Sequence, residues 1–131
     1  MLKEIIKTDK VSKPVGPYSV AVKAAGTFLF ISGTVGFDPD GNVVAGGFGG
    51  QCRQAYENIK IVLEEAGATF KNVVRFTNYL IDANDYPVMA EIRKEYLEDL
   101  DEVPASTLIE VKGLLYPDLL VEIDTIAILE S

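Results

Sequence analysis

Apolar and polar residues alternate most clearly between Leu119 and Leu129. One face of this run would carry Val121, Ile123, Thr125 and Ala127, and the other Leu120, Glu122, Asp124, Ile126 and Ile128. A period of two residues is typical of a β-strand. The run Ala105–Val111 is rich in Thr, Leu, Ile and Val, and Gly113, Tyr116, Pro117 and Asp118 supply turn residues between the two runs. We therefore predict two strands joined by a short connection.

Similar patterns predict further strands earlier in the chain. Leu2–Ile6 has the character of a short edge strand. Tyr18–Ala25 and Phe28–Thr34 flank a turn at Ala25-Gly26-Thr27, which predicts a β-hairpin. Val73–Ile81 is a further apolar run that favours a strand.

Two segments show the helical period instead. Gln51–Ala66 places seven residues on one stripe, and Gly67 follows as a typical C-terminal cap: the stripe is Cys52, Ala55, Tyr56, Ile59, Val62, Leu63 and Ala66. A second helix is predicted after Asp85, a candidate N-cap, with Pro87 tolerated in its first turn. Its expected buried face is Met89, Ile92, Tyr96 and Leu97. The glycine-rich segment Phe37–Gly50 is predicted to be a loop, and it lacks the Gly-Lys-Ser/Thr of a phosphate loop.

This order of elements predicts one domain over residues 1–131. A helix between strands indicates a βαβ crossover, so we expect an α/β (α+β) fold with a mixed sheet of about six strands and both helices on one face. The other face would then be free to pack against neighbouring subunits. A hydrophobic content of 48% and a mean hydropathy of +0.18 are high for a monomer of this size, which supports that expectation.

Charge and composition exclude several classes of function. The net charge of −8 opposes nucleic-acid binding, because cations that neutralise phosphates supply most of that affinity. No apolar run approaches the ~20 residues of a membrane span, and Met1–Lys10 carries charges where a signal peptide needs an apolar core. We therefore expect a cytoplasmic protein without membrane or nucleic-acid partners.

The chain contains no histidine and one cysteine, Cys52. Catalysis by Ser-His or Cys-His pairs and histidine zinc sites are thus excluded, and acid–base chemistry needs carboxylates, Tyr, Lys or water. Cys52 is expected to be a small packing residue. The acidic residues lack the spacing of a calcium loop, and we expect neither a metal nor a cofactor.

Glu122 is the most informative carboxylate because apolar residues flank it within a strand. If it is buried, its pKa rises toward the range useful for a general acid or base. Alternatively, it lies on a solvated face or pairs across the sheet.

The segments Pro104-Ala105-Ser106 and Leu120-Val121-Glu122-Ile123 resemble the C-terminal signature of the RidA/YjgF/L-PSP family. Further similarity lies in Gly16-Pro17-Tyr18-Ser19, in Phe30-Ile31-Ser32-Gly33, in the first predicted helix with its cap (Gln51–Gly67), and in Asn84-Asp85-Tyr86 at the start of the second. The resemblance covers nearly the full length. It implies a chorismate-mutase-like homotrimer that hydrolyses reactive enamines and imines in clefts between subunits. There an arginine fork grips the substrate carboxylate, and a glutamate-held water attacks the imine carbon.

The match is incomplete where the family binds its substrate. Tyr18, Ser32, Gly33 and Glu122 coincide with the family's residues, but Ser106 replaces the carboxylate-binding arginine. Leu108 replaces a frequent Cys, Ala90 a frequent Asn, and Arg93 a frequent Tyr. The resemblance implies catalytic roles for Glu122 and Ser32, and substrate contacts from Tyr18, Gly33, Ser106, Thr107 and Arg93. Tyr18 and Ser32 are equally consistent with purely structural roles.

Arg93 and Arg75 are the cations that could replace the missing arginine; the alternative for each is a surface or interface ion pair. Ser106 and Thr107 could instead bind a neutral carbonyl or hydroxyl. The first hypothesis is therefore an enzyme acting on small enamine- or imine-type metabolites that differ from the usual 2-imino acids. The second is a non-catalytic trimer that binds a metabolite or a partner protein. A nuclease or translation inhibitor is disfavoured by the acidic charge and by the lack of histidine.

Overall fold

Four strands form a mixed sheet in the order β3-β6-β4-β5. A computed structural model describes residues 2–130. β3 (Thr27–Thr34) and β4 (Val73–Leu80) both run antiparallel to the central strand β6 (Val121–Leu129). β5 (Ala105–Glu110) is parallel to β4 and follows the second helix. The predicted βαβ crossover is therefore present, and the strand with the clearest alternation lies inside the sheet.

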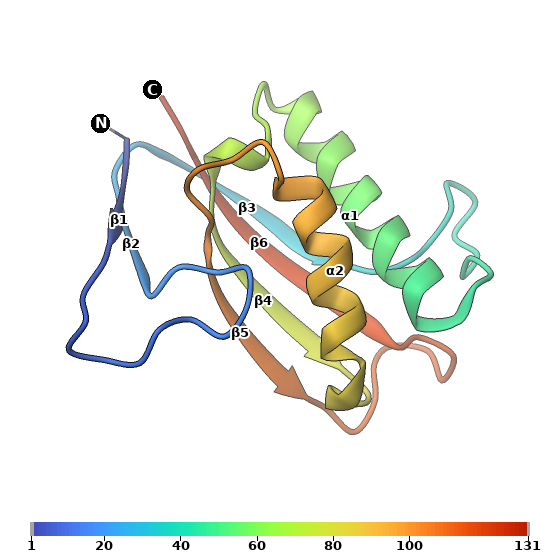
Figure 1. The fold of residues 1–131 in the computed structure, drawn as a ribbon. Helices are drawn as coiled ribbons and strands as arrows, with labels where there is room; N and C mark the ends of the chain where they lie inside the picture. Colours follow the sequence, from blue (N-terminus) through green and yellow to red (C-terminus); the bar gives the residue numbers. More distant parts are fainter. Residues whose placement is uncertain (1, 131) are drawn as a thin grey trace.

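Both helices cover the same face of this sheet (Figure 1). α1 (Gly47–Glu65) and α2 (Tyr86–Leu97) are accompanied by two short 3-10 turns, η1 (Phe70–Asn72) and η2 (Ala83–Asp85). The core between helices and sheet is made of fully buried apolar side chains, which include Tyr56, Ile59, Leu63, Phe76, Met89, Val121 and Ile123. Cys52 is buried in this core, as expected of a packing residue. No helix within residues 2–130 is long and apolar enough to cross a bilayer.

The prediction of a single sheet of six strands with an N-terminal hairpin is wrong. β1 (Lys3–Ile6) and β2 (Ala21–Ala24) pair with each other as a separate antiparallel sheet, and β3 pairs with β6. Gly26 lies at the bend between β2 and β3 with a φ of 138°, a conformation that favours glycine. The bend carries the chain from one sheet to the other instead of closing a hairpin.

α1 begins earlier than the sequence pattern predicts. The glycines at 47, 49 and 50 belong to the helix, although they were expected to be loop. Gly46 and Gly47 have φ values of 105° and 62°, so they make the left-handed turn that starts the helix before any apolar stripe is visible. Gly67, with a φ of 77°, follows the helix end as predicted, and its N–H donates to the Glu64 carbonyl at 3.0 Å.

α2 begins where the sequence indicates, but its cap differs from the prediction. Asp85 precedes the helix without a side-chain capping bond, and Asp82 instead accepts a hydrogen bond from the Asn84 N–H at 2.9 Å. Met89, Ile92 and Leu97 are buried as predicted.

The register of β6 divides its side chains between two faces. Ile123 and Thr125 lie opposite Asn78 and Phe76 of β4 and point toward the helices, whereas Glu122 and Asp124 lie opposite Tyr79 and Thr77. We call the side away from the helices the open face; it carries Arg75, Thr77, Tyr79, Thr107, Glu122 and Asp124. Glu122 thus lies on the open face, near the beginning of the inner strand β6.

Candidate functional site

An irregularity in β3 brings Ser32 and Gly33 against β6. The pairing of the two strands is regular as far as Ile31 and Thr125, and it resumes with a shift at Thr34 and Ile123. Such bulges redirect side chains and are frequent beside active sites. A methyl group added to Gly33 would collide with the carboxylate of Glu122. Because Gly33 has no side chain, the Glu122 carboxylate can lie against the backbone of β3 at this residue.

The surroundings of Glu122 favour its protonated form. The pKa of Glu122 is raised from 4.5, first by partial burial and second by the nearby carboxylate of Asp124. Asp124 accepts a hydrogen bond from the Tyr79 hydroxyl at 3.2 Å. Glu122 therefore lies on the face of the sheet that the helices leave open, with partial burial that raises its pKa and with no cation paired to it among residues 2–130.

The open face also holds a cation and several hydroxyl groups. Arg75 donates to the hydroxyl of Thr107 at 2.6 Å and to that of Thr77 at 3.3 Å. A shallow cavity of about 290 Å³ lies beside them and is lined by Phe30, Ile31, Ser32, Arg75, Thr77, Asp124, Thr125 and Ile126. Ser32 and Arg75 therefore line the same cavity. Neither of these two residues forms a salt bridge with another residue between 2 and 130. Of the surface or interface ion pair considered for Arg75, no surface pair is formed among residues 2–130.

Arg93 belongs to α2, which covers the opposite face of the sheet, and its side chain is completely buried. Its guanidinium donates through Nε to the Tyr56 hydroxyl at 2.8 Å, through Nη1 to Ser106 Oγ at 2.9 Å and through Nη2 to Asn78 Oδ1 at 2.7 Å. It also lies over the ring of Phe76, 5.0 Å from the centroid. The interpretation of Arg93 as a surface ion pair is therefore wrong, because three polar groups from other elements hold it inside.

Tyr18 belongs to the same side of the molecule as Arg93. The Ser19 N–H donates to the Pro104 carbonyl at 2.8 Å, and the Ser19 hydroxyl donates to the Val103 carbonyl, so this loop is fastened just before β5. A Cβ on Gly16 would collide with the Tyr86 hydroxyl and would lie 3.5 Å from the Tyr18 ring. The Tyr18 hydroxyl accepts a hydrogen bond from the Val15 N–H at 3.2 Å.

The predicted site residues thus fall into two groups within one chain. The open-face group contains Glu122, Ser32, Gly33 and Thr107; the helix-side group contains Ser106, Arg93 and Tyr18. Ser106 and Thr107 are adjacent in sequence, but the pleat of β5 directs them to opposite faces.

Sequence reasoning missed the residues that hold Arg93. Asn78 is completely buried, and its amide Nδ2 donates to Ser106 Oγ at 2.9 Å. A buried amide needs partners, so an Asn in an apolar strand was an available signal. Tyr56 gave no comparable signal, because an aromatic residue on a helical stripe is ordinarily core.

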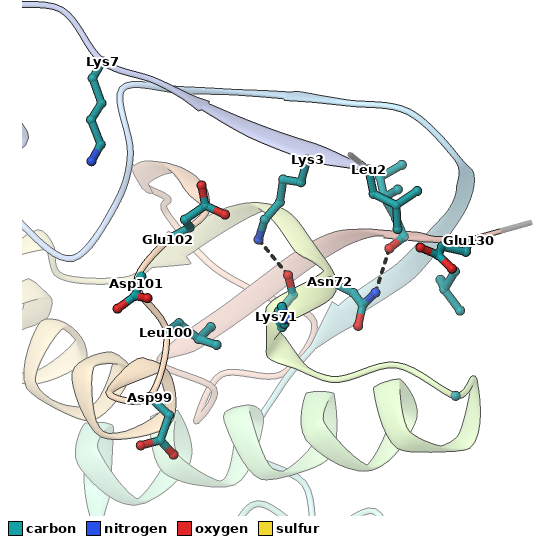
Figure 2. Close-up of a pocket in the computed structure, with 13 residues that line it drawn as sticks. Leu2, Lys3, Lys7, Lys71, Asn72, Asp99, Leu100, Asp101, Glu102 and Glu130 are labelled. Atoms are coloured by element: carbon teal, nitrogen blue, oxygen red, sulfur yellow. Dashed lines mark hydrogen bonds between the residues drawn. The ribbon is translucent and has the colours of Figure 1, made fainter.

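The larger cavity lies elsewhere and includes none of the predicted site residues among its described lining. Figure 2 shows this space of about 1060 Å³ beside β1 and the end of α2, where Lys3 Nζ donates to the Lys71 carbonyl at 2.7 Å. Lysines 3, 7 and 71 line it together with Asp99, Asp101, Glu102 and Glu130. Within residues 2–130, no cluster of three or more His, Cys, Asp or Glu side chains could hold a metal ion.

Comparison with known proteins connects this geometry to a family. The family model described as Endoribonuclease L-PSP matches residues 8–129. A RutC family protein of Pyrococcus abyssi is 44% identical over 128 residues, which cover 97% of this chain and 98% of that protein. A mouse protein named 2-iminobutanoate/2-iminopropanoate deaminase is 38% identical over 115 residues, covering 87% of this chain and 83% of its own.

A solved structure agrees with these relatives. A Yersinia pestis protein of the Rid family, described as of unknown function, superposes with a TM-score of 0.89 and 31% identity, covering 98% of this chain and all of that chain. The chain therefore belongs to the endoribonuclease L-PSP family, which is the family of the RutC and Rid proteins.

Proposed function

We propose that this protein hydrolyses small reactive enamines or imines in clefts formed between copies of the chain, most simply in a homotrimer. The observation that carries the proposal is the Glu122 carboxylate, which lies against Gly33 at the irregular end of β3 and has a raised pKa. The deaminase name of the mouse relative supports the same class of reaction. The expected setting is the cytoplasm.

The reaction needs one water molecule and one proton carrier. Glu122 takes a proton from the water as its oxygen bonds to the carbon of the C=N group. The protonated carboxyl then returns this proton to the nitrogen, which gives a carbinolamine. The carboxylate next moves the hydroxyl proton of the carbinolamine to the amino nitrogen, so that the C=O group forms as the C–N bond breaks and ammonia leaves. An enamine first takes a proton on carbon to become the imine. A carboxylate with a raised pKa suits both halves of this exchange, because general acid–base catalysis works best when the pKa approaches the working pH.

The division of the residues supports a site between subunits. Glu122 and Ser32 lie on the open face, whereas Ser106 and Tyr18 lie on the helix side. One cleft can contain both groups of residues only if a second copy of the chain contributes one of them. In that arrangement the β5 edge of the second copy meets the open face of the first. Within such a cleft, Ser106 offers a single hydroxyl where the family's arginine offers a fork, so we infer substrates that differ from the usual 2-imino acids.

An endoribonuclease activity, which the family description names, has less chemical support. The chain has no histidine and carries a net charge of −8, so it lacks both the usual proton carrier and the cations that bind phosphates. A non-catalytic trimer that binds a metabolite is the alternative that the following experiment separates from the enzyme.

The test is release of ammonia from enzymatically generated 2-aminoacrylate and 2-iminobutanoate, which serve as test compounds of this reaction class although the preferred substrate is inferred to differ from them. Glu122→Gln removes the proton acceptor with little change in shape, and we expect kcat/KM to fall by about 10²–10⁴-fold. In the wild type, kcat/KM should rise with pH through a pKa above 4.5, because only the carboxylate form accepts the proton and burial and Asp124 raise its pKa.

The matched control is Glu110→Gln, since Glu110 is exposed at the end of β5 and bonds only to the Ala83 N–H at 2.9 Å. Ammonia release that is equal in wild type and Glu122→Gln would reject the proposal. Binding of the product 2-oxobutanoate without any turnover would favour the metabolite-binding alternative.

A further inference from the structure

The cavity beside β1 is lined by charges of both signs that form no ion pairs. Seven charged side chains surround this space of about 1060 Å³: Lys3, Lys7, Lys71, Asp99, Asp101, Glu102 and Glu130. The salt bridges among residues 2–130 lie on the two helices and use none of these seven side chains. Opposite charges attract most strongly at contact distance. Charges that stay apart around a shared space are therefore available to a ligand that enters it.

Different segments of the chain supply the two signs (Figure 2). Lys3 belongs to β1, Lys7 follows that strand, and Lys71 lies in η1. The acidic connection, which we define as residues 99–102, lies between α2 and β5 and supplies three of the four acids. A ligand in the cavity thus meets ammonium groups from β1 and η1 and carboxylates from the acidic connection.

Lys3 keeps one N–H donor without a protein partner. A lysine ammonium carries three N–H donors. Two of them are used, because Nζ donates to the Lys71 carbonyl at 2.7 Å and to the Val73 carbonyl at 3.3 Å. Residues 2–130 offer the third donor no acceptor in hydrogen-bonding position. The two bonds fix the ammonium at the wall of the cavity, and the third donor remains for a ligand.

The charge of Lys3 is also incompletely compensated. Burial lowers the pKa of Lys3, Glu102 acts in the opposite direction, and the nearby ammonium of Lys71 lowers the pKa further. An anion placed between Lys3 and Lys71 would offset both unfavourable effects. The carboxylate of a ligand is such an anion, and it would accept the third N–H of Lys3.

A ligand with charge of one sign does not suit this cavity. A simple anion would be repelled by the acidic connection, and a simple cation by the lysines. A zwitterion satisfies both sides. The volume lies at the upper end of the ~300–1,000 Å³ of typical ligand sites, so there is room for more than a single ion. Four aliphatic side chains complete the lining and suit short apolar groups between the two charges: Leu2, Leu100, Ile128 and Leu129.

We propose that this cavity binds a small zwitterion of about dipeptide size. Its carboxylate lies between Lys3 and Lys71, and its ammonium lies against Glu102 and the other acids of the acidic connection. The described lining of the cavity includes none of the residues placed in the catalytic cleft. This second site is therefore independent of the proposed function.

Three matched ligands test the requirement for both charges. Alanylalanine carries an ammonium and a carboxylate, its N-acetyl derivative keeps only the carboxylate, and its C-terminal amide keeps only the ammonium. Titration calorimetry at low ionic strength should give alanylalanine the lowest Kd, by about fivefold or more against each derivative. Added salt should weaken its binding, because both contacts are between charges.

Two substitutions assign each charge of the ligand to one side of the cavity. Lys71→Gln should weaken the binding of alanylalanine by about fivefold and should not raise the Kd of the amide, which has no carboxylate for Lys71. Glu102→Gln should weaken alanylalanine to a similar extent and should not raise the Kd of the N-acetyl derivative, which has no ammonium. Both residues are exposed, and the Lys71 carbonyl that holds Lys3 is kept, so we expect both variants to fold.

Control variants show whether the effect belongs to this cavity. Lys60→Gln and Asp40→Asn remove exposed charges that lie outside the lining, and they should change none of the three Kd values. Glu122→Gln should also leave the binding of alanylalanine unchanged, which separates this site from the catalytic cleft.

Several results would overturn the assignment. A wild type that binds alanylalanine no more tightly than its two derivatives, including one that binds none of them, would refute it. Binding that is lost in Glu122→Gln but kept in Lys71→Gln and Glu102→Gln would place the ligand in the cleft instead. Equal weakening of all three ligands by Lys71→Gln would show a structural role only. Ammonia release enters none of these measurements, so failure of the proposed function and failure of this inference are distinguishable.

Discussion

Gly33 is important because it has no Cβ atom. The space in which its Cβ would lie is occupied by the carboxylate of Glu122. Gly33→Ala should therefore displace that carboxylate and reduce kcat/KM for 2-iminobutanoate by about 10–100-fold, since a shift near 1 Å in a catalytic group has effects of this size. The free energy of unfolding should change by less than about 1 kcal/mol, because the displaced group is the flexible end of a side chain.

A matched substitution distinguishes this effect from a general response to an added methyl group. Gly113→Ala places a methyl group in open space, and its activity should equal that of the wild type. If Gly33→Ala also keeps full activity, the contact between Gly33 and Glu122 has no catalytic role.

At the level of single residues, the sequence was informative where a pattern is local. The alternation of the last strand placed Glu122 on the face predicted for it, and Gly33 of the irregular strand β3 lies against its carboxylate. The burial of Arg93 could not be predicted from a local sequence pattern. It depends on Tyr56 of α1 and Asn78 of β4, which are distant in sequence and meet Arg93 only in the folded chain.

At the level of elements, the contact between α2 and β5 has room for one cation. Arg93 on the helix occupies the space behind Ser106 on the strand. Ser106→Arg alone would bring a second guanidinium beside the buried one, and the repulsion should lower the free energy of unfolding by about 1–3 kcal/mol. The midpoint of urea denaturation measures this loss.

The double variant Ser106→Arg/Arg93→Tyr removes that repulsion and should recover most of the lost stability, with a coupling energy of about 0.5–3 kcal/mol in a double-mutant cycle. Thr107→Arg is the control, because Thr107 faces the open side of β5 and should show no coupling to Arg93→Tyr. Additive effects of the two substitutions at 106 and 93 would mean that the helix and strand positions do not share one site for a cation.

The errors at this scale have a common physical cause. Two strands separated by a short turn normally form a hairpin, but β2 and β3 enter different sheets because β3 has β6 as its partner and β2 has β1. Pairing of strands distant in sequence is a property of the whole fold and leaves no local pattern. The early start of α1 was equally hidden, since glycine is a poor predictor of a helix and the first turn is set by backbone angles at Gly46 and Gly47.

At the level of the whole molecule, two aromatic residues of β3 are exposed on the open face beside its polar side chains. Phe28 and Phe30 are 57% and 70% exposed there, and their rings contact each other with centroids 5.8 Å apart. Exposed aromatic residues that adjoin one another mark an interface more often than isolated ones do. The proposed homotrimer would cover this surface and at the same time bring the β5 edge of one copy to Glu122 of the next.

Mixing two inactive variants tests that arrangement directly. Chains with Glu122→Gln and chains with Ser106→Ala each lack one half of every cleft, so either variant alone should be nearly inactive. If the cleft joins Glu122 of one copy to Ser106 of its neighbour, each mixed trimer contains one intact cleft, because a head-to-tail ring pairs the two halves in order. Equimolar chains that are unfolded and refolded together should then recover about a quarter of the wild-type ammonia release. Recovery fails if both halves of the site belong to one chain, and native mass spectrometry of the same sample shows whether the mixed trimers have formed.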